Sequence, residues 1–251
     1  MLENILFILV IYNKVLEVSV AYQSLKLLLG GSLNNCLYVH DNTNNNIFLA
    51  AAYNKGLAEA NRRGKEWIVL LDDDTELSSA YLEELMKITI TNSVAAAPIL
   101  IDSKGEQLSP TYYNKHRGPF LINSTHKNNV TNVLNSGFAI RCSTIEKIGN
   151  FNTNFPLDYL DVYTCFMLYK VGVTIDIMPT KLVHNLSIKD YEHNVSRNRY
   201  LSYLQGEHDF AYAMGGKALF YYRLRLIGRV IKWSFTRHLY VKETIYALFK
   251  K

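Results

Sequence analysis

Three consecutive carboxylates, Asp72, Asp73 and Asp74, follow the apolar run of residues 66–71 in the stretch EWIVLLDDDTEL. Neighbouring carboxylates repel one another, and no local structure requires them. In an extended segment residues i and i+2 point to the same side, so Asp72 and Asp74 can converge while Asp73 turns away or supports the loop. Two hard oxygen ligands suit Mg²⁺ or Mn²⁺, which would neutralise a diphosphate. The alternative is a solvated strand end before a helix.

The elements around the triplet alternate between strands and helices. Short apolar runs predict strands, and spacings of three and four residues between apolar positions predict helices. The expected strands cover residues 5–11, 35–42 and 66–71, and the expected helices cover 16–29, 47–64 and 79–89. This order argues for a parallel sheet covered by helices. Ligands of such sheets bind beyond the carboxyl ends of the strands, where Asp41 and the triplet fall.

Two further acids lie in the second half of the chain. Residues 102–133 are polar and rich in turn residues, and strands are expected at 132–141, 173–179 and 181–186. Residues 157–172 predict a helix with Asp158 and Asp161 in its first turn. Their i, i+3 spacing would place both on one helix face, so that either could be a general base. Stabilisation of the helix dipole is the alternative role.

Composition indicates one medium-sized domain, or one domain with an appendage, in a chain of 251 residues. Three widely spaced cysteines suit a reducing compartment rather than a disulfide framework. The first residues lack the basic start of a signal peptide, and no apolar run is long enough to span a membrane. We therefore expect a cytoplasmic protein. The net charge is +5, but residues 216–251 alone carry +8, which argues against a uniformly cationic nucleic-acid binder.

The basic tail predicts an amphipathic helix. Within residues 217–237 an apolar stripe recurs at i, i+4, i+7 and i+11, and a basic stripe lies well away from it. The apolar stripe consists of Phe220, Leu224, Ile227 and Ile231, and the basic stripe of Arg225, Arg229 and Lys232. Docking on an anionic membrane face is one interpretation. The other is packing on the catalytic core or on a second subunit in a homo-oligomer, with a solvated basic face.

Several motifs taken in order resemble a known family. These are LVIYNK, YVHDNT, AAAYNKGLAEA, WIVLLDDDTEL, NSGFAIR, DYLDVYTCFMLYKVG and KLVHNLS, and they extend over roughly residues 5–200. Together they resemble a family 2 glycosyltransferase of the GT-A fold, closest to the rhamnosyltransferase- and galactofuranosyltransferase-like branch. The resemblance implies an α/β fold with a mostly parallel, Rossmann-like sheet flanked by helices, followed by a C-terminal helical, basic appendage.

The resemblance also implies roles for particular residues. Nucleotide-sugar binding falls to Tyr12, Asp41, Asn54, Asp72 and Asp73. Asp74 would be the principal ligand of Mn²⁺ or Mg²⁺, with Asp72 and His184 completing the metal site. Asp161 matches the catalytic base, and the acceptor and sugar pocket would be lined by Asn135, Ser136, Gly137 and Asp158. Gly137 would allow close backbone approach, although a simple bulge explains it nearly as well.

The expected function is an inverting, metal-dependent sugar transfer in the assembly of a bacterial surface polysaccharide. The donor would be a UDP-, dTDP- or GDP-linked sugar and the acceptor a glycan or lipid-linked glycan, with no nucleic-acid partner. Residues 1–101 would bind the nucleotide sugar, 102–200 the acceptor, and 201–251 would form the amphipathic appendage. Location in the cytoplasm, with peripheral attachment to the cytoplasmic face of the membrane, would follow.

Two alternatives stay open. Many family members carry an acid where this chain has Tyr163 and an arginine where it has Met167. These departures are compatible with a non-catalytic, membrane-associated partner that keeps the fold. A sugar nucleotidyltransferase is the second alternative. It would require a glycine-rich loop after the first strand, and this chain has IYNK there.

Overall fold

The computed structural model describes residues 2–114, 118–122, 129–184, 196–236 and 240–249. Its contacts divide the chain into two compact units. The first unit comprises Met1–Thr111 and Thr131–Asn185, and the second comprises Tyr112–Val130 and Leu186–Lys251. Each unit has a hydrophobic cluster of its own. The sequence-based division into residues 1–101, 102–200 and 201–251 describes expected ligand-binding roles rather than packing, and it stays a prediction.

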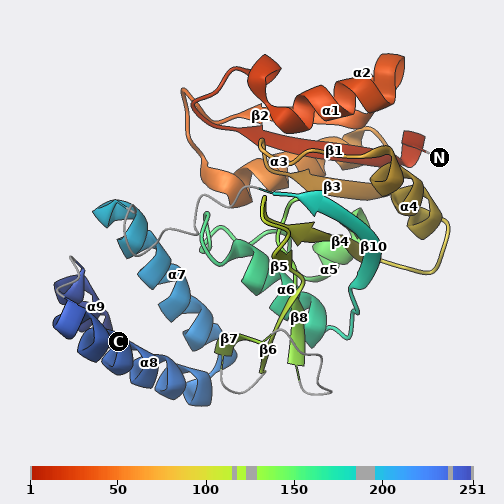
Figure 1. Cartoon of the computed structure of the whole chain (residues 1–251). Helices are drawn as coiled ribbons and strands as arrows, with labels where there is room; N and C mark the ends of the chain where they lie inside the picture. The colour runs from red at the N-terminus through yellow and green to blue at the C-terminus, as the bar shows by residue number, and fades with distance from the viewer. Residues whose placement is uncertain (1, 115–117, 123–128, 185–195, 237–239, 250–251) are drawn as a thin grey trace. The chain divides into compact units, whose positions relative to one another are not determined.

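The first unit is built on a seven-stranded sheet (Figure 1). Its strands are β1 Ile5–Ile11, β2 Leu37–Asp41, β3 Trp67–Leu71, β4 Ala95–Ile101, β5 Gln107–Ser109, β9 Phe138–Arg141 and β10 Asp176–Val183. Six of them follow the order β10-β4-β9-β3-β1-β2, and β5 pairs with β4. The expected mostly parallel sheet is confirmed, with β9 inserted antiparallel between β3 and β4.

Helices cover both faces of this sheet. Alternate side chains of β1 and β3 point to opposite faces, because the side-chain period of a strand is two. On one face they pack with α1 (Val20–Leu29), α2 (Leu33–Cys36) and α4 (Ser79–Thr89). On the other face α3 (Phe48–Arg62) lies so close that a Cβ at Gly56 would be 2.6 Å from Ile8. The shorter helices α5 (Cys142–Lys147) and α6 (Leu160–Lys170) follow β9.

Two local expectations were wrong. The expected helix at 16–29 is a 3₁₀ turn, Leu16–Val18, followed by α1, because the side chain of Ser19 accepts a hydrogen bond from Tyr22 N (3.2 Å) and caps α1. The two strands expected at 173–179 and 181–186 form one strand, β10. Pro179 is accommodated there because β10 is an edge strand whose register shifts between Ile177 and Lys181.

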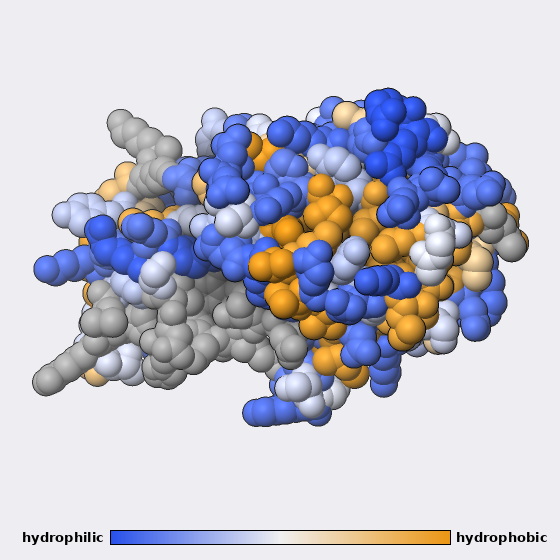
Figure 2. All heavy atoms as spheres, turned by 90° about the horizontal axis from the view of Figure 1, so that it is seen from above, coloured by the Kyte–Doolittle hydropathy of each residue, from blue (hydrophilic) through white to orange (hydrophobic). Residues whose placement is uncertain are grey.

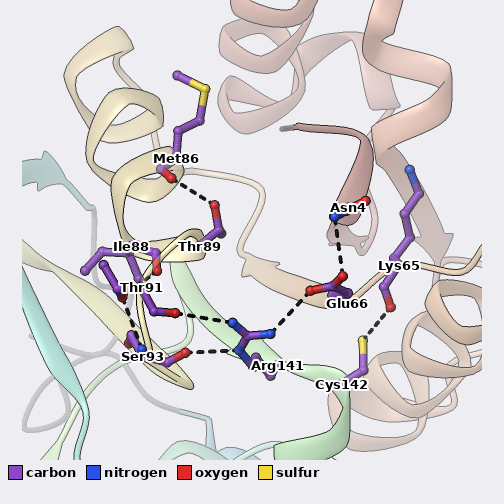
Figure 3. A network of polar contacts seen from close by, with 10 residues as sticks. All are labelled: Asn4, Lys65, Glu66, Met86, Ile88, Thr89, Thr91, Ser93, Arg141 and Cys142. Carbon is purple, nitrogen blue, oxygen red and sulfur yellow. Dashed lines mark hydrogen bonds and ion pairs between the residues drawn. The ribbon is translucent and has the colours of Figure 1, made fainter.

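A polar network joins the elements at the amino end of β3 (Figure 3). The guanidinium of Arg141 donates to Glu66 (3.3 Å) and to the carbonyls of Ser93 (3.0 Å) and Thr91 (3.4 Å). It also lies over the ring of Trp67, 4.9 Å from the centroid. The network therefore joins β9 to the start of β3 and to the loop before β4. Within it the acid Glu66 is paired with the base Arg141.

The second unit is mainly helical. Its helices are α7 Arg197–Met214, α8 Gly216–Thr236 and α9 Val241–Leu248. A small sheet has the order β7-β6-β8, formed by Gly118–Ile122, Thr111–Asn114 and Asn129–Asn132. The helices share a core that includes Tyr200, Leu204, Tyr222, Leu226 and Trp233. Within the described ranges, no helix has both the length and the apolar character needed to cross a membrane.

Helix α8 is amphipathic, as expected. The expectation that its basic face is exposed to solvent is wrong for Arg225 and Arg229. Arg229 donates two hydrogen bonds to the buried carboxylate of Glu207 (3.1 Å each), and Arg225 lies 3.8 Å from it. The expected apolar stripe faces solvent instead, while Tyr222 and Leu226 are buried. A buried carboxylate on the neighbouring helix α7 explains the reversal, because it needs a cation to compensate its charge.

Candidate active site

The carboxyl ends of β1, β2 and β3 meet at one edge of the sheet. In the parallel register Leu9 pairs with Leu71, and Ile11 pairs with Asp41. The loops that follow the three strands therefore begin side by side, as parallel strands require. This edge holds both Asp41 and the triplet, as the sequence predicted.

The three carboxylates of the triplet have different partners. Asp72 accepts a hydrogen bond from the hydroxyl of Ser136 at 2.6 Å. Asp73 forms an ion pair with Lys14 at 2.6 Å, and its backbone carbonyl accepts from Ser19 Oγ at 2.9 Å. Asp73 thus supports the loop. The expected division between a supporting Asp73 and two other site acids fits this arrangement.

Asp74 lies beside His184, 109 residues further along the chain. Its Oδ1 is buried, has no hydrogen-bond partner among the described residues, and lies 3.3 Å from His184 Nδ1. That nitrogen is hydrogen-bonded to Thr75 Oγ1 at 2.8 Å. Burial lowers the pKa of His184, but the contact with Asp74 and the charges of Asp72 and Asp74 outweigh it, so the pKa is raised.

These residues fit a divalent cation only in part. Within the part of the chain that the structure describes, no group of three or more His, Cys, Asp or Glu is placed to hold a metal. The ring nitrogen of His184 that lies beside Asp74, Nδ1, is already hydrogen-bonded to Thr75. The orphaned Oδ1 of Asp74 and the nearby Asp72 still suit Mg²⁺ or Mn²⁺, because such ions bind through one or two carboxylates and complete their shell with substrate phosphate oxygens.

Asp161 lies close enough to Asp72 for their charges to interact. Burial raises the pKa of Asp161 to about 6, and the charges of Asp72 and Asp158 add to the effect. Burial also raises the pKa of Asp72, although the hydrogen bond from Ser136 opposes this. A buried carboxyl group with a pKa near neutrality is suited to take up a proton.

Tyr53 is a neighbour of these acids that the sequence reasoning missed. It is fully buried on α3, and its hydroxyl has no hydrogen-bond partner among the described residues. Burial and the charges of Asp72 and Asp161 raise its pKa far above the usual range. The only available signal was a tyrosine within an alanine-rich helix, which core packing explains equally well.

Asp158 is not part of the helix. Helix α6 begins at Leu160, and Tyr159 before it has a left-handed backbone with φ 64°. The expected first helical turn with Asp158 and Asp161 on one face is therefore wrong. Asp161 accepts from Val162 N at 2.8 Å, whereas Asp158 is buried in the preceding loop.

The candidate nucleotide residues lie on loops and on α3. Hydrogen bonds from the side chain and from the backbone N–H of Thr43 lower the pKa of Asp41, and the backbone nitrogen lies 2.8 Å from the Asp41 carboxylate. Thr43 Oγ1 accepts from Asn13 N (3.1 Å), so the loops after β1 and β2 are joined. Tyr12 is half exposed. Both ends of the Asn54 amide bind the backbone of Phe151, at 2.8 and 3.0 Å. Nucleotide binding by Asn54 stays a prediction, and it would require these bonds to open.

The segment Asn135–Ser136–Gly137 precedes β9 and forms a turn rather than part of the strand. Gly137 has φ +77°, donates to Leu70 O at 2.8 Å, and has Pro98 2.9 Å from where a Cβ would lie. Glycine is therefore required by the turn and its packing. The turn aims Ser136 at Asp72, and Asn135 accepts from Phe138 N through its carbonyl.

Comparisons with known proteins agree with this fold. Residues 25–149 match the family model described as "Glycosyl transferase family 2". A dTDP-rhamnosyl transferase, RfbF of Shigella flexneri, is 25% identical over 151 residues, which cover 56% of this chain and 50% of that protein. The chain thus aligns with about half the length of this curated relative. The crystal structure of TarS residues 1–349 from S. aureus superimposes with a TM-score of 0.50 at 11% identity, covering 93% of this chain and 92% of that one. The chain belongs to glycosyltransferase family 2, and it has the mostly parallel α/β fold expected of a GT-A enzyme.

Proposed function

We propose that this protein transfers a sugar from a nucleotide-diphosphate sugar to a hydroxyl group of a glycan or lipid-linked acceptor, with inversion at the anomeric carbon. The observation that carries the proposal is the position of Asp161. It is a carboxyl group with a pKa raised to about 6, beside Asp72 at the ligand-binding edge of the sheet. A base at this edge would meet a donor held by the loops after β1, β2 and β3.

The chemistry requires one base. The carboxylate of Asp161 takes the proton of the acceptor hydroxyl while that oxygen attacks the anomeric carbon. The bond between this carbon and the diphosphate oxygen breaks from the opposite side, and the nucleoside diphosphate leaves with the electron pair. Its pKa near 6 allows Asp161 to be ionised at neutral pH and to remain basic enough to accept the proton. Asp158 is the alternative base.

The donor site is proposed on the adjacent loops. Tyr12 and Asp41 would contact the base or ribose, and Asp72 and Asp74 would lie at the diphosphate. Asp74, Asp72 and His184 would hold Mn²⁺ or Mg²⁺, which would supply positive charge to neutralise the leaving diphosphate. The name of the Shigella relative places dTDP-rhamnose first among the UDP-, dTDP- and GDP-sugars to test.

The acceptor side would involve the turn at Asn135–Gly137 and the loop that carries Asp158. We propose a role in bacterial surface polysaccharide assembly, with a lipid-linked acceptor reached from the cytoplasmic face of a membrane. The protein would attach there peripherally, because an enzyme that acts on lipid-linked glycans gains from staying near the bilayer.

A thermal-shift screen of dTDP-, UDP- and GDP-sugars, with and without Mn²⁺, tests the proposal. A ligand that binds only the folded protein at about 100 times its Kd adds about 2.7 kcal/mol to stability. We expect one nucleotide class to raise the Tm, and more so with Mn²⁺. Release of the free nucleotide in the presence of an acceptor extract would then measure transfer.

The same screen distinguishes the alternatives. If no nucleotide stabilises the protein, a non-catalytic partner is the better interpretation. The packing of Tyr163 on Phe155, with ring centroids 4.4 Å apart, gives that residue a structural role compatible with either outcome. Stabilisation by a nucleoside triphosphate with release of pyrophosphate would indicate a nucleotidyltransferase instead.

A further inference from the structure

Lys14 lies at the candidate active site, although the sequence predicted no role for it. An exposed lysine is ordinary in itself, because hydrophilic side chains cover much of the surface that Figure 2 shows. Lys14 differs in its position. It follows β1 in the loop at the carboxyl edge of the sheet, and its Nζ is 2.6 Å from a carboxylate oxygen of Asp73. It therefore places a positive charge beside the loop where the donor diphosphate is proposed to lie.

The ion pair between Lys14 and Asp73 is open to solvent. The side chain of Lys14 is 47% exposed and that of Asp73 is 20% exposed. Ion pairs with such exposure contribute little to stability, because water and salt screen the charges and the long lysine side chain loses freedom in the pair. Lys14 can therefore exchange Asp73 for another anion at a small cost in free energy.

Other hydrogen bonds hold the two loops that this ion pair joins. The backbone carbonyl of Asp73 accepts from Ser19 Oγ (2.9 Å) and from Ala21 N (3.3 Å), both at the start of α1. In the loop after β1, Asn13 N donates to Thr43 Oγ1 (3.1 Å). These bonds involve neither the lysine ammonium group nor the Asp73 carboxylate, so they can keep both loops in place when the ion pair opens.

The carboxylates around Lys14 make positive charge necessary for a bound diphosphate. Burial raises the pKa of Asp72, and the charges of Asp74 and Asp73 add to the rise. A diphosphate at this edge would be repelled by the same charges unless cations accompany it. A lysine ammonium group is a compact charge that commonly binds phosphates. A diphosphate also carries more negative charge than the single carboxylate that Lys14 would leave.

We infer that Lys14 leaves Asp73 when the donor binds and forms an ion pair with the diphosphate of the nucleotide sugar. There it helps to hold the donor, and it stabilises the charge that builds on the diphosphate as the bond to the anomeric carbon breaks. Asp73 is the partner of the lysine in the ligand-free protein. The inference rests on the proposed function for the identity of the ligand, but the ion pair itself requires binding only.

Calorimetry with dTDP on the full chain tests this inference, and UDP or GDP replaces dTDP if the nucleotide screen selects one of them. Lys14→Gln should raise the Kd of dTDP about tenfold, as expected from loss of a contact to a charged group. Lys14→Arg keeps the charge and should stay within about threefold of the wild type. The matched control is Lys26→Gln, which changes an exposed lysine in the last turn of α1 and should bind like the wild type. The Tm of Lys14→Gln should change by less than about 4 °C, because the ion pair is solvated.

Asp73→Asn separates a contact with the ligand from a purely structural ion pair. Loss of the Asp73 charge frees Lys14 for the diphosphate, so this variant should bind dTDP at least as tightly as the wild type. If the pair only supports the loop, Asp73→Asn and Lys14→Gln should weaken binding alike, and that result would overturn the inference.

Salt and divalent ions identify the group that Lys14 contacts. The loss caused by Lys14→Gln should persist without divalent ions, because the lysine carries its own charge, and it should decrease at high salt. A loss seen only with Mn²⁺ would place the effect at the metal site. A loss that salt does not change would place the lysine on an uncharged part of the nucleotide. Either result would overturn the inference.

Sugar transfer measured on the same samples separates this inference from the proposed function. Weaker dTDP binding by Lys14→Gln, in a protein whose wild type transfers no sugar, would refute the transfer proposal alone. Transfer by the wild type, with dTDP binding unchanged in Lys14→Gln, would refute the inference about Lys14 alone. A wild type that binds none of dTDP, UDP and GDP would refute both.

Discussion

Strand β3 begins beside a network in which acids and bases are paired, and it ends beside a group of acids. At its start Glu66 receives a guanidinium hydrogen bond from Arg141, and Arg141 also binds two backbone carbonyls. At its end, the carboxyl groups of Asp72 and Asp161 are close enough to raise each other's cost of ionisation. Lys14 lies at this end too, and it is committed to Asp73.

The difference shows which end of the sheet is arranged for stability and which for a ligand. Paired charges at the amino end satisfy each other within the protein. Like charges near one another at the carboxyl end cost folding free energy, and a cation or a proton in transit would relieve that cost. The same strand therefore connects a structural end to a candidate active site.

The largest expected effect is the loss of the base. Asp161→Asn should lower the rate of sugar transfer by about 10²–10⁴-fold, because general base catalysis typically contributes that much. Binding of the donor should persist, which calorimetry with dTDP and Mn²⁺ would establish. If Asp158→Asn instead gave the larger loss, the base would be the acid in the loop before α6.

A smaller effect is expected when single carboxylates of the triplet are replaced. Asp74→Asn should weaken Mn²⁺-dependent nucleotide binding by about tenfold or more, as expected from loss of a contact to a charged group. Asp73→Asn is the matched control, since its carboxylate is bound to Lys14 rather than open to a ligand, and it should change the Kd by less than about threefold. Equal effects of the two variants would contradict a metal site at Asp74.

The free energy of unfolding should depend on pH through Asp161, near the carboxyl end of β3. The pKa of Asp161 is raised from 3.8 to about 6 in the folded protein, so ionising it in the fold costs free energy that unfolding recovers. Stability is therefore lost as pH rises from about 4 to about 6. Asp161→Asn should remove this loss and stabilise the metal-free protein at pH 7.5 by roughly 1–2 kcal/mol, discounted for partial solvent access.

Melting curves at pH 4.5 and 7.5 without divalent ions would measure that difference. The gain from Asp161→Asn should be much smaller at the lower pH. An equal gain at both values would mean that the pKa of Asp161 is not raised in the fold.

At the amino end of β3, removal of a charge should lower the stability, and this change should be the smallest of those predicted here. Glu66→Gln removes the charge that faces Arg141, and we expect a loss of less than about 1 kcal/mol, because the pair is partly solvated and salt-screened. Denaturant unfolding would measure it, with Glu76→Gln as an exposed control. A stabilising Glu66→Gln would remove the distinction between the two ends.

Much of the fold was predictable because it depends on local patterns. Runs such as 5–11 and 66–71 have the length and composition of buried strands, and their alternation with helices implies a parallel sheet. The antiparallel insertion of β9 was not predictable, since no local signal specifies which partners a strand will find. Nor was the start of α6, because the left-handed backbone of Tyr159 displaces it by three residues from the apolar pattern.

By itself the sequence determined that carboxylates would meet at one edge of a sheet, because Asp41 and Asp72–Asp74 end strands that run in the same direction. The tertiary structure alone decided how they are divided: Ser136 binds Asp72, Lys14 binds Asp73, and His184 lies beside Asp74. It alone also decided that α8 turns Arg225 and Arg229 inward. Both outcomes depend on partners distant in sequence, such as Glu207 for α8, and the free energy of a buried charge is set by those partners rather than by its neighbours along the chain.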